Sequence, residues 1–236
     1  MNLSCAPRVG LLLVSFLLAC SREEGGIRLR LDLAQGTEGK GAVVTPSGKR
    51  VTLRRGFVVI QSVEIFSCAA QTRWWQRLTP ISTAHAHGVE TPTRFAVPQV
   101  ESLLRPAGEM RVLGELAPPP GSYCRVRVVF GPADADAEGL PNEAGVDLVG
   151  KSFWVEGEGT APGAVEATPL SLTGDGVSGA EVSFLPVTLS REIPEGLLTL
   201  RFDAAKWLDA LDLQIPNGAP LAQALSASIS ADASSR

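Results

Sequence analysis

The chain contains only two histidines, and they lie two positions apart, at His85 and His87. On an extended segment, residues i and i+2 point to the same side, so the two imidazole rings can bind one metal ion, each through one ring nitrogen. Imidazole is a ligand that suits copper, zinc and nickel. Glu90 is the nearest carboxylate in the sequence, and two ligands alone do not complete a coordination shell. The alternative is a solvated loop whose histidines hydrogen-bond to the backbone.

Four tryptophans are the next side chains with a distinct chemistry. Trp74 and Trp75 are neighbours, and neighbouring residues on a strand point to opposite faces, so we expect one in the core and the other partly exposed. An exposed indole on a secreted protein can stack on a sugar or contact a partner protein. For Trp154 and Trp207 we expect core packing.

The acidic and nucleophilic residues form no catalytic pattern. Residues 134–145 carry three carboxylates at the spacing of the first half of a calcium-binding EF-hand loop, but Gly145 stands where that loop needs a bidentate glutamate. We interpret this stretch as an acidic surface turn, with weak calcium binding as the alternative. The sequence contains no HExxH, GxSxG or CxxC motif, and a catalytic serine would have only His85 or His87 as its base. We therefore expect that the protein is not an enzyme.

The N-terminus is typical of a secretory signal. One basic residue precedes a short apolar run, which ends in a small residue and Cys20. The ending Leu-Leu-Ala-Cys resembles the lipobox of bacterial lipoproteins, which predicts a signal peptide over 1–19, a lipidated Cys20 and a polar tether over 20–26. Ser21 after the cysteine indicates the outer membrane of the bacterial envelope. The alternative is a soluble secreted protein in which Cys20 is incidental.

The charge of the mature chain excludes one class of partner. Removal of residues 1–19 takes away one basic residue, Arg8, so 20 basic side chains (21 minus 1) face 25 acidic ones. A mildly acidic protein is a poor match for the phosphates of nucleic acids, so we expect no nucleic-acid partner.

Two cysteines remain in the mature chain besides Cys20, at Cys68 and Cys124. In an oxidising compartment, a widely spaced pair is most simply a disulfide. The alternation of residues 123–130 places Cys124 on the same apolar face as Val126 and Val128, which fits a buried bridge. The alternative is a pair of thiolate metal ligands.

The remaining pattern predicts an all-β fold, an antiparallel β-sandwich with one or two short helices. The two predicted helices cover 97–104 and 203–211, the second with Asp203 as its N-cap. We place the sandwich domain over 27–216 and a C-terminal tail over 217–236, and we expect its small, polar end, 224–236, to fray. Period-two alternation or β-branched runs between Gly/Pro turns predict the strands, at 27–33, 54–68, 110–116, 123–130, 151–157, 164–172, 180–189 and 196–203.

Several of these segments resemble the MbnP-like family in order and spacing, and they cover most of the mature chain. They are GFVVIQSVEIFSC (56–68), GSYCRVRVVFG (121–131), LPNEAG (140–145), KSFW (151–154) and LLTLRFDAAKWL (197–208). The resemblance implies a secreted bacterial β-sandwich associated with copper, with a di-haem peroxidase-like partner that oxidises a tryptophan. A group of Gly/Pro-rich bacterial lipoproteins of unknown function matches PPPGSYCRV (118–126) about equally well.

The chain also departs from the MbnP-like pattern. It lacks the four-cysteine arrangement, it has no histidine after Trp154, and the tyrosine expected soon after that tryptophan is absent. A copper site would therefore be built around His85 and His87, with Trp74 or Trp75 as the modified residue.

Two hypotheses about function follow. The first is an envelope lipoprotein that binds a metal ion, copper, through His85 and His87, for metal capture or presentation to a redox partner. The second is a structural or adhesive surface lipoprotein, which binds a protein or glycan through Trp74, Trp75 and the acidic turn. A third reading, a sugar-processing enzyme, needs two carboxylates about 5 to 9.5 Å apart in a cleft.

Overall fold

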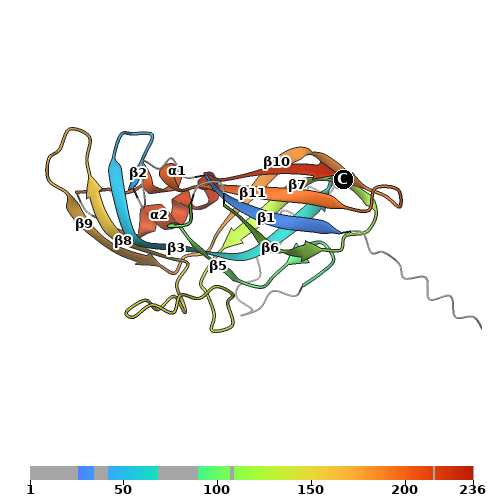
Figure 1. The fold of residues 1–236 in the computed structure, drawn as a ribbon, viewed down its shortest axis with the longest axis horizontal. Coiled ribbons are helices and arrows are strands. Elements are labelled where there is room, and N and C mark those ends of the chain that lie inside the picture. Colours follow the sequence, from blue (N-terminus) through green and yellow to red (C-terminus); the bar gives the residue numbers. More distant parts are fainter. Residues whose placement is uncertain (1–25, 35–41, 69–89, 107–108, 215, 236) are drawn as a thin grey trace, which may run out of the picture.

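Two β-sheets and two short helices make up the part of the chain that the computed structural model describes, residues 26–34, 42–68, 90–106, 109–214 and 216–235. The sheets contain eight and four strands, and they pack face to face (Figure 1). The predicted all-β sandwich is confirmed. Within the described ranges, no helix has the length and apolar character needed to cross a membrane.

The longest strand, β3 (Arg50–Ser67), organises the larger sheet. Its sequence is rich in β-branched residues, and Val58, Val59 and Ile60 are buried in succession, which fits a strand covered on both faces. Val58 pairs with Phe153 on one side and Glu101 on the other.

The strands along β3 are short compared with it. One edge pairs with β8 (Phe153–Thr160) and then β7 (Gly121–Phe130), and the other pairs with β2 (Ala42–Val44), β5 (Gln99–Ser102) and β4 (Arg94–Phe95). Strand β9 (Thr168–Gly174) lies beside β8, and β10 (Ser178–Leu189) lies beside β7. These strands give the sheet its elongated outline (Figure 1).

The smaller sheet has the order β12 (Ile229–Ser235), β11 (Gly196–Asp203), β1 (Ile27–Ala34) and β6 (Met110–Leu116). Its central pair, β1 and β11, is parallel, whereas the other strand pairs of the described residues are antiparallel. The predicted antiparallel arrangement therefore holds for the sandwich except at this pair. A parallel pair needs a long connection, and here most of the domain lies between the two strands.

Aromatic rings fill the space between the sheets and the helices. Phe130 and Phe202 pack with their ring centroids 6.0 Å apart, and Trp207 contacts Phe202 at 5.7 Å and Phe153 at 5.5 Å. The indole nitrogen of Trp207 donates a hydrogen bond to the carbonyl of Leu221 at 2.8 Å. The predicted core role of Trp207 is confirmed.

The helix predicted over 203–211 is present as α1 (Ala204–Leu208). Asp203 is its N-cap, since its carboxylate accepts a hydrogen bond from the backbone nitrogen of Lys206 at 3.0 Å. Trp154, the other tryptophan expected in the core, is half-buried and packs against a small second cluster that contains Phe57 and Leu148.

The helix predicted over 97–104 is wrong, because Gln99–Ser102 form strand β5. The apolar spacing of this stretch fits one face of a helix. However, residues 57–60 at the edge of β3 present backbone N–H and C=O groups that need hydrogen-bond partners. Residues 99–102 satisfy these groups as a strand, and a helix could not. Tertiary pairing overrides the local pattern.

The C-terminal tail was expected over 217–236 with a fraying end, but its described residues, 217–235, belong to the sandwich. Helix α2 (Ala219–Ala224) packs over Trp207, a 3-10 turn η3 (Ser226–Ser228) follows, and β12 pairs along its own full length with residues 196–202 of β11. Apart from Ile229 the apolar residues of β12 are alanines, so their alternation with polar neighbours is a weak signal in the sequence.

Candidate functional site

The predicted metal, lipid and partner residues lie outside the part of the chain that the structure describes. These residues are Cys20, Trp74, Trp75, His85 and His87. Of the predicted site residues, Cys68 and Cys124 are described, and the segment that contains the histidines begins directly after Cys68.

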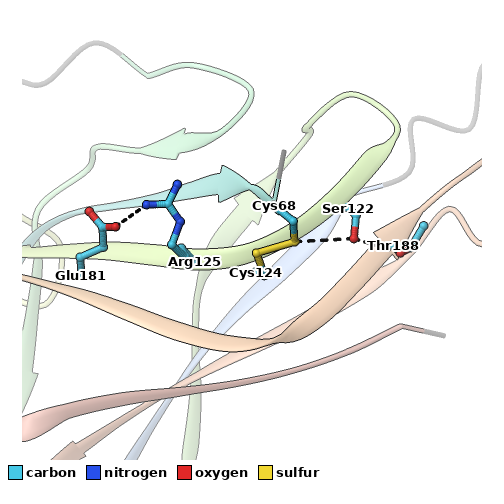
Figure 2. Close-up of a disulfide and its surroundings, with 6 residues drawn as sticks. All are labelled: Cys68, Ser122, Cys124, Arg125, Glu181 and Thr188. Carbon is cyan, nitrogen blue, oxygen red and sulfur yellow. Dashed lines mark hydrogen bonds and ion pairs between the residues drawn. A yellow bond between two sulfur atoms is a disulfide. The ribbon is translucent and has the colours of Figure 1, made fainter. Parts of the chain in front are cut away.

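The disulfide between Cys68 and Cys124 is confirmed. Its Cα atoms are 5.3 Å apart, and it joins the end of β3 to the beginning of β7, two neighbouring strands (Figure 2). The hydroxyl of Ser122 lies 3.7 Å from the sulfur of Cys68 and accepts a hydrogen bond from Thr188 at 3.3 Å. Both cysteines are half-buried, so the bridge lies at the border of the core.

The prediction that Cys124 lies on the buried face of β7 with Val126 and Val128 is wrong in detail. The register of β3 against β7 shifts by one residue between Phe66 and Ser67, and this irregularity interrupts the alternation of β7. As a result, Tyr123 is buried with Val126, while Cys124 is only half-buried. Burial raises the pKa of the Tyr123 hydroxyl, which donates a hydrogen bond to the carbonyl of Pro119 at 2.7 Å.

One end of the sandwich gathers the features that bear on function, and we call it the disulfide end. Here β3 ends at Ser67, β7 begins beside it, and β1 and β11 begin at Ile27 and Gly196. Short connections at 117–120 and 190–195 join the two sheets here, and Ser235 pairs with Gly196 (Figure 1). The opposite end carries the turn 161–167, because β8 ends beside the start of β3.

The segment that contains the two histidines follows β3, and the chain after it pairs with β3 again near the disulfide end. It leaves β3 at Cys68, and it rejoins through β4, which pairs antiparallel with residues 63–64 of β3. The return is tied by a hydrogen bond from the Ile65 nitrogen to the Thr93 carbonyl at 2.9 Å. Both flanks of residues 69–89 are therefore held by the larger sheet.

A cluster of two arginines and an aromatic ring lies beside the disulfide. The guanidinium carbons of Arg125 and Arg127 are 5.6 and 5.2 Å from the centroid of the Phe66 ring, which is cation–π geometry. Both arginines donate hydrogen bonds to the carboxylate of Glu181, and Figure 2 shows the one from Arg125. The cluster fixes the outer face of β3 and β7 where the disulfide joins them.

A second charged cluster lies in the larger sheet and has no signal in the sequence. Glu101 is completely buried on β5 and forms ion pairs with Arg105 and Arg111. Burial raises the pKa of the Glu101 carboxyl, and the two arginines oppose that rise. Arg111 also donates to the side-chain oxygen of Gln99 at 2.7 Å. The cluster connects β5 to β6 and therefore one sheet to the other.

The acidic turn contains no cation site among the described residues. The carboxylate of Asp134 accepts a hydrogen bond from the backbone nitrogen of Asp136 at 3.1 Å, and Glu138 accepts one from Gln99 at 2.9 Å. Within the described ranges, no three side chains of His, Cys, Asp or Glu gather closely enough to hold a metal ion.

Comparisons with known proteins give one distant structural similarity. No protein-family model matches the chain, and the search of curated proteins finds no match. Among solved structures, MbnP from Methylosinus trichosporium aligns over 79% of this chain and 78% of its own, with 13% sequence identity and a TM-score of 0.38. A similarity at this level carries no argument about fold or function, so the function is argued from the residues of this chain.

Proposed function

We propose that the protein is a lipid-anchored envelope protein that binds one copper ion through His85 and His87 and catalyses no reaction itself. Acyl groups on Cys20 would hold it at the outer membrane. Its role would be to capture copper or to present it to a redox partner of the di-haem peroxidase-like kind. The observation that carries the proposal is the isolated pair of histidines in a segment whose two flanks are fixed on one sheet.

The anchoring of the two flanks supports metal binding in physical terms. A metal site requires its ligands to be held close together, and each free residue that binding orders costs conformational entropy. Here the chain before residue 69 is tied by the disulfide, and the chain after residue 89 enters a turn in which Thr91 and Arg94 exchange two backbone hydrogen bonds of 3.1 and 3.0 Å. The two ends of the segment that bears the histidines are thus held in place without a metal.

The proposed role in presentation follows from the number of imidazoles. Copper in nitrogen and oxygen sites commonly takes about four ligands in a square arrangement. The chain has only two histidines, so two imidazoles leave positions for solvent or for ligands of a partner. A site of this kind gives up its metal more easily than one closed by four protein ligands.

The test is a copper titration of the chain that begins at Ser21, which lacks the acyl group. We expect one copper ion per chain in the unchanged protein and in a control with Ser82→Ala and Thr83→Ala, two polar residues of the same segment. The variant with His85→Ala and His87→Ala should lose that binding. If it takes up copper with the stoichiometry and affinity of the control, the proposal is wrong.

A further inference from the structure

We infer that the disulfide end rests on the head groups of a zwitterionic phospholipid membrane, with Arg28 and Arg30 facing lipid phosphates. This inference depends on the lipid anchor proposed for Cys20, and it adds which surface of the domain meets the membrane.

The length of the tether carries the first part of the argument. Six residue steps separate Cys20 from Gly26, and a fully extended chain covers about 20 to 22 Å in six steps. Strand β3 has 18 residues, which correspond to about 60 Å along the strand. The tether is therefore much shorter than the domain, so the end where β1 begins must lie near the membrane.

The turns at this end present apolar surface of the kind that enters a head-group layer. Ile193 is 40% exposed in the 190–195 turn. The 117–120 connection lies beside this turn, because Gly121 pairs with Leu189. Pro119 and Pro120 are exposed on it. Prolines carry no backbone N–H group, so this connection brings fewer unsatisfied donors into a region poor in water.

Charges at the disulfide end match a head group that carries both signs. A hollow of about 130 Å³ is lined by Arg28, Arg30, Glu115 and Glu195. Arg28 donates to Glu115 at 3.0 Å, and both side chains are more than half exposed. Guanidinium groups bind phosphate oxygens, and carboxylates bind an ammonium group. Two cations and two anions in one hollow therefore complement phosphatidylethanolamine better than a purely anionic lipid.

The adjoining turn keeps the same balance. Arg191 and Glu192 are both exposed on the 190–195 connection, so this turn contributes one further positive and one further negative charge, side by side. A surface for anionic lipids would carry an excess of basic side chains, and this one does not.

The experiment uses the full acylated chain in vesicles of phosphatidylethanolamine and phosphatidylcholine. A photo-cross-linking amino acid replaces Ile193 in one variant and Val165 in the matched control. Val165 is an apolar residue, 98% exposed, in the turn at the opposite end. We expect cross-links to lipid at position 193 at several-fold higher yield than at position 165. Equal yields, or a higher yield at position 165, would overturn the orientation.

Two further arms separate the parts of the inference. The mass of the N-terminal peptide shows whether Cys20 is acylated, so a missing acyl group contradicts the proposed anchor and not the choice of surface. With acylated protein, Arg28→Ala combined with Arg30→Ala should lower the yield at position 193 several-fold. Replacing the zwitterionic lipids by phosphatidylglycerol should lower it as well, and a higher yield in phosphatidylglycerol would overturn the choice of head group.

Discussion

Removal of the disulfide is the perturbation whose magnitude follows most directly from the structure. Cys68 and Cys124 are separated by 56 positions, and closing a loop of that size in the unfolded chain stabilises the fold by about 4 kcal/mol in the chain-entropy model. Backbone hydrogen bonds already pair β3 with β7, so the folded state keeps its register without the bridge. We therefore expect Cys68→Ser combined with Cys124→Ser to fold and to lose about 4 kcal/mol of unfolding free energy.

Urea denaturation of the chain that begins at Ser21 measures this loss. With a slope of about 2 to 2.5 kcal/mol per molar urea, the midpoint should fall by roughly 1.5 to 2 M. Ser122→Ala is the matched control, because it removes the hydroxyl beside the sulfur and leaves the bridge intact. A double variant whose midpoint stays within the error of the control would refute the reasoning, since the bridge would then not constrain the unfolded chain.

Two further predictions concern the larger sheet. Because burial raises the pKa of Glu101 above its ordinary value of 4.5, the folded state holds that proton more tightly than the unfolded state, and this group's contribution to stability is lost as the pH rises above that value. Urea midpoints from pH 4 upward should therefore show the wild type losing stability relative to Glu101→Gln, and a relative gain would contradict the assignment. Gly157→Ala should destabilise by about 1 to 3 kcal/mol, since its Cβ would overlap the backbone carbonyl of Thr52. Gly179→Ala is its control, because a Cβ at that position would lie 3.6 Å from the nearest backbone atom. Equal urea midpoints for the two variants would contradict the prediction, since the sheet would then adjust to a side chain at Gly157.

The strands were predictable wherever one face is apolar and the other polar. Residues 27–33 and 196–203 alternate clearly, and both form strands of the smaller sheet. The β-branched run before Cys68 also predicts a long strand, and helix α1 follows from its N-cap and its apolar face. These signals are local, because they depend on the period of the side chains and on a single capping residue.

The errors arise where a distant part of the chain decides the local structure. Residues 99–102 carry a helical pattern, and the free edge of β3 makes them a strand. The small residues of 229–235 bury little apolar area individually, and the exposed edge of β11 orders them. The burial of Glu101 could not be predicted, since its two arginine partners reach it only after β5 and β6 are placed.

The site itself was predictable only in part. Two widely spaced cysteines behind an N-terminus typical of a secretory signal are a strong signal for a disulfide, and the structure contains it. The clustering of the start of β1, the disulfide and both flanks of residues 69–89 near one end is a property of the topology. No spacing in the sequence shows that these parts, which lie far apart along the chain, share one end of the sandwich.

The most direct test of the central claim is the nitrogen coupling of bound copper. Because the chain has only two histidines, labelling histidine alone with ¹⁵N marks only His85 and His87. In the electron paramagnetic resonance of the Cu²⁺-loaded protein, we expect couplings from two imidazole nitrogens, which change when ¹⁴N is replaced by ¹⁵N. A copper signal that is identical in labelled and unlabelled protein would show that these histidines do not hold the metal.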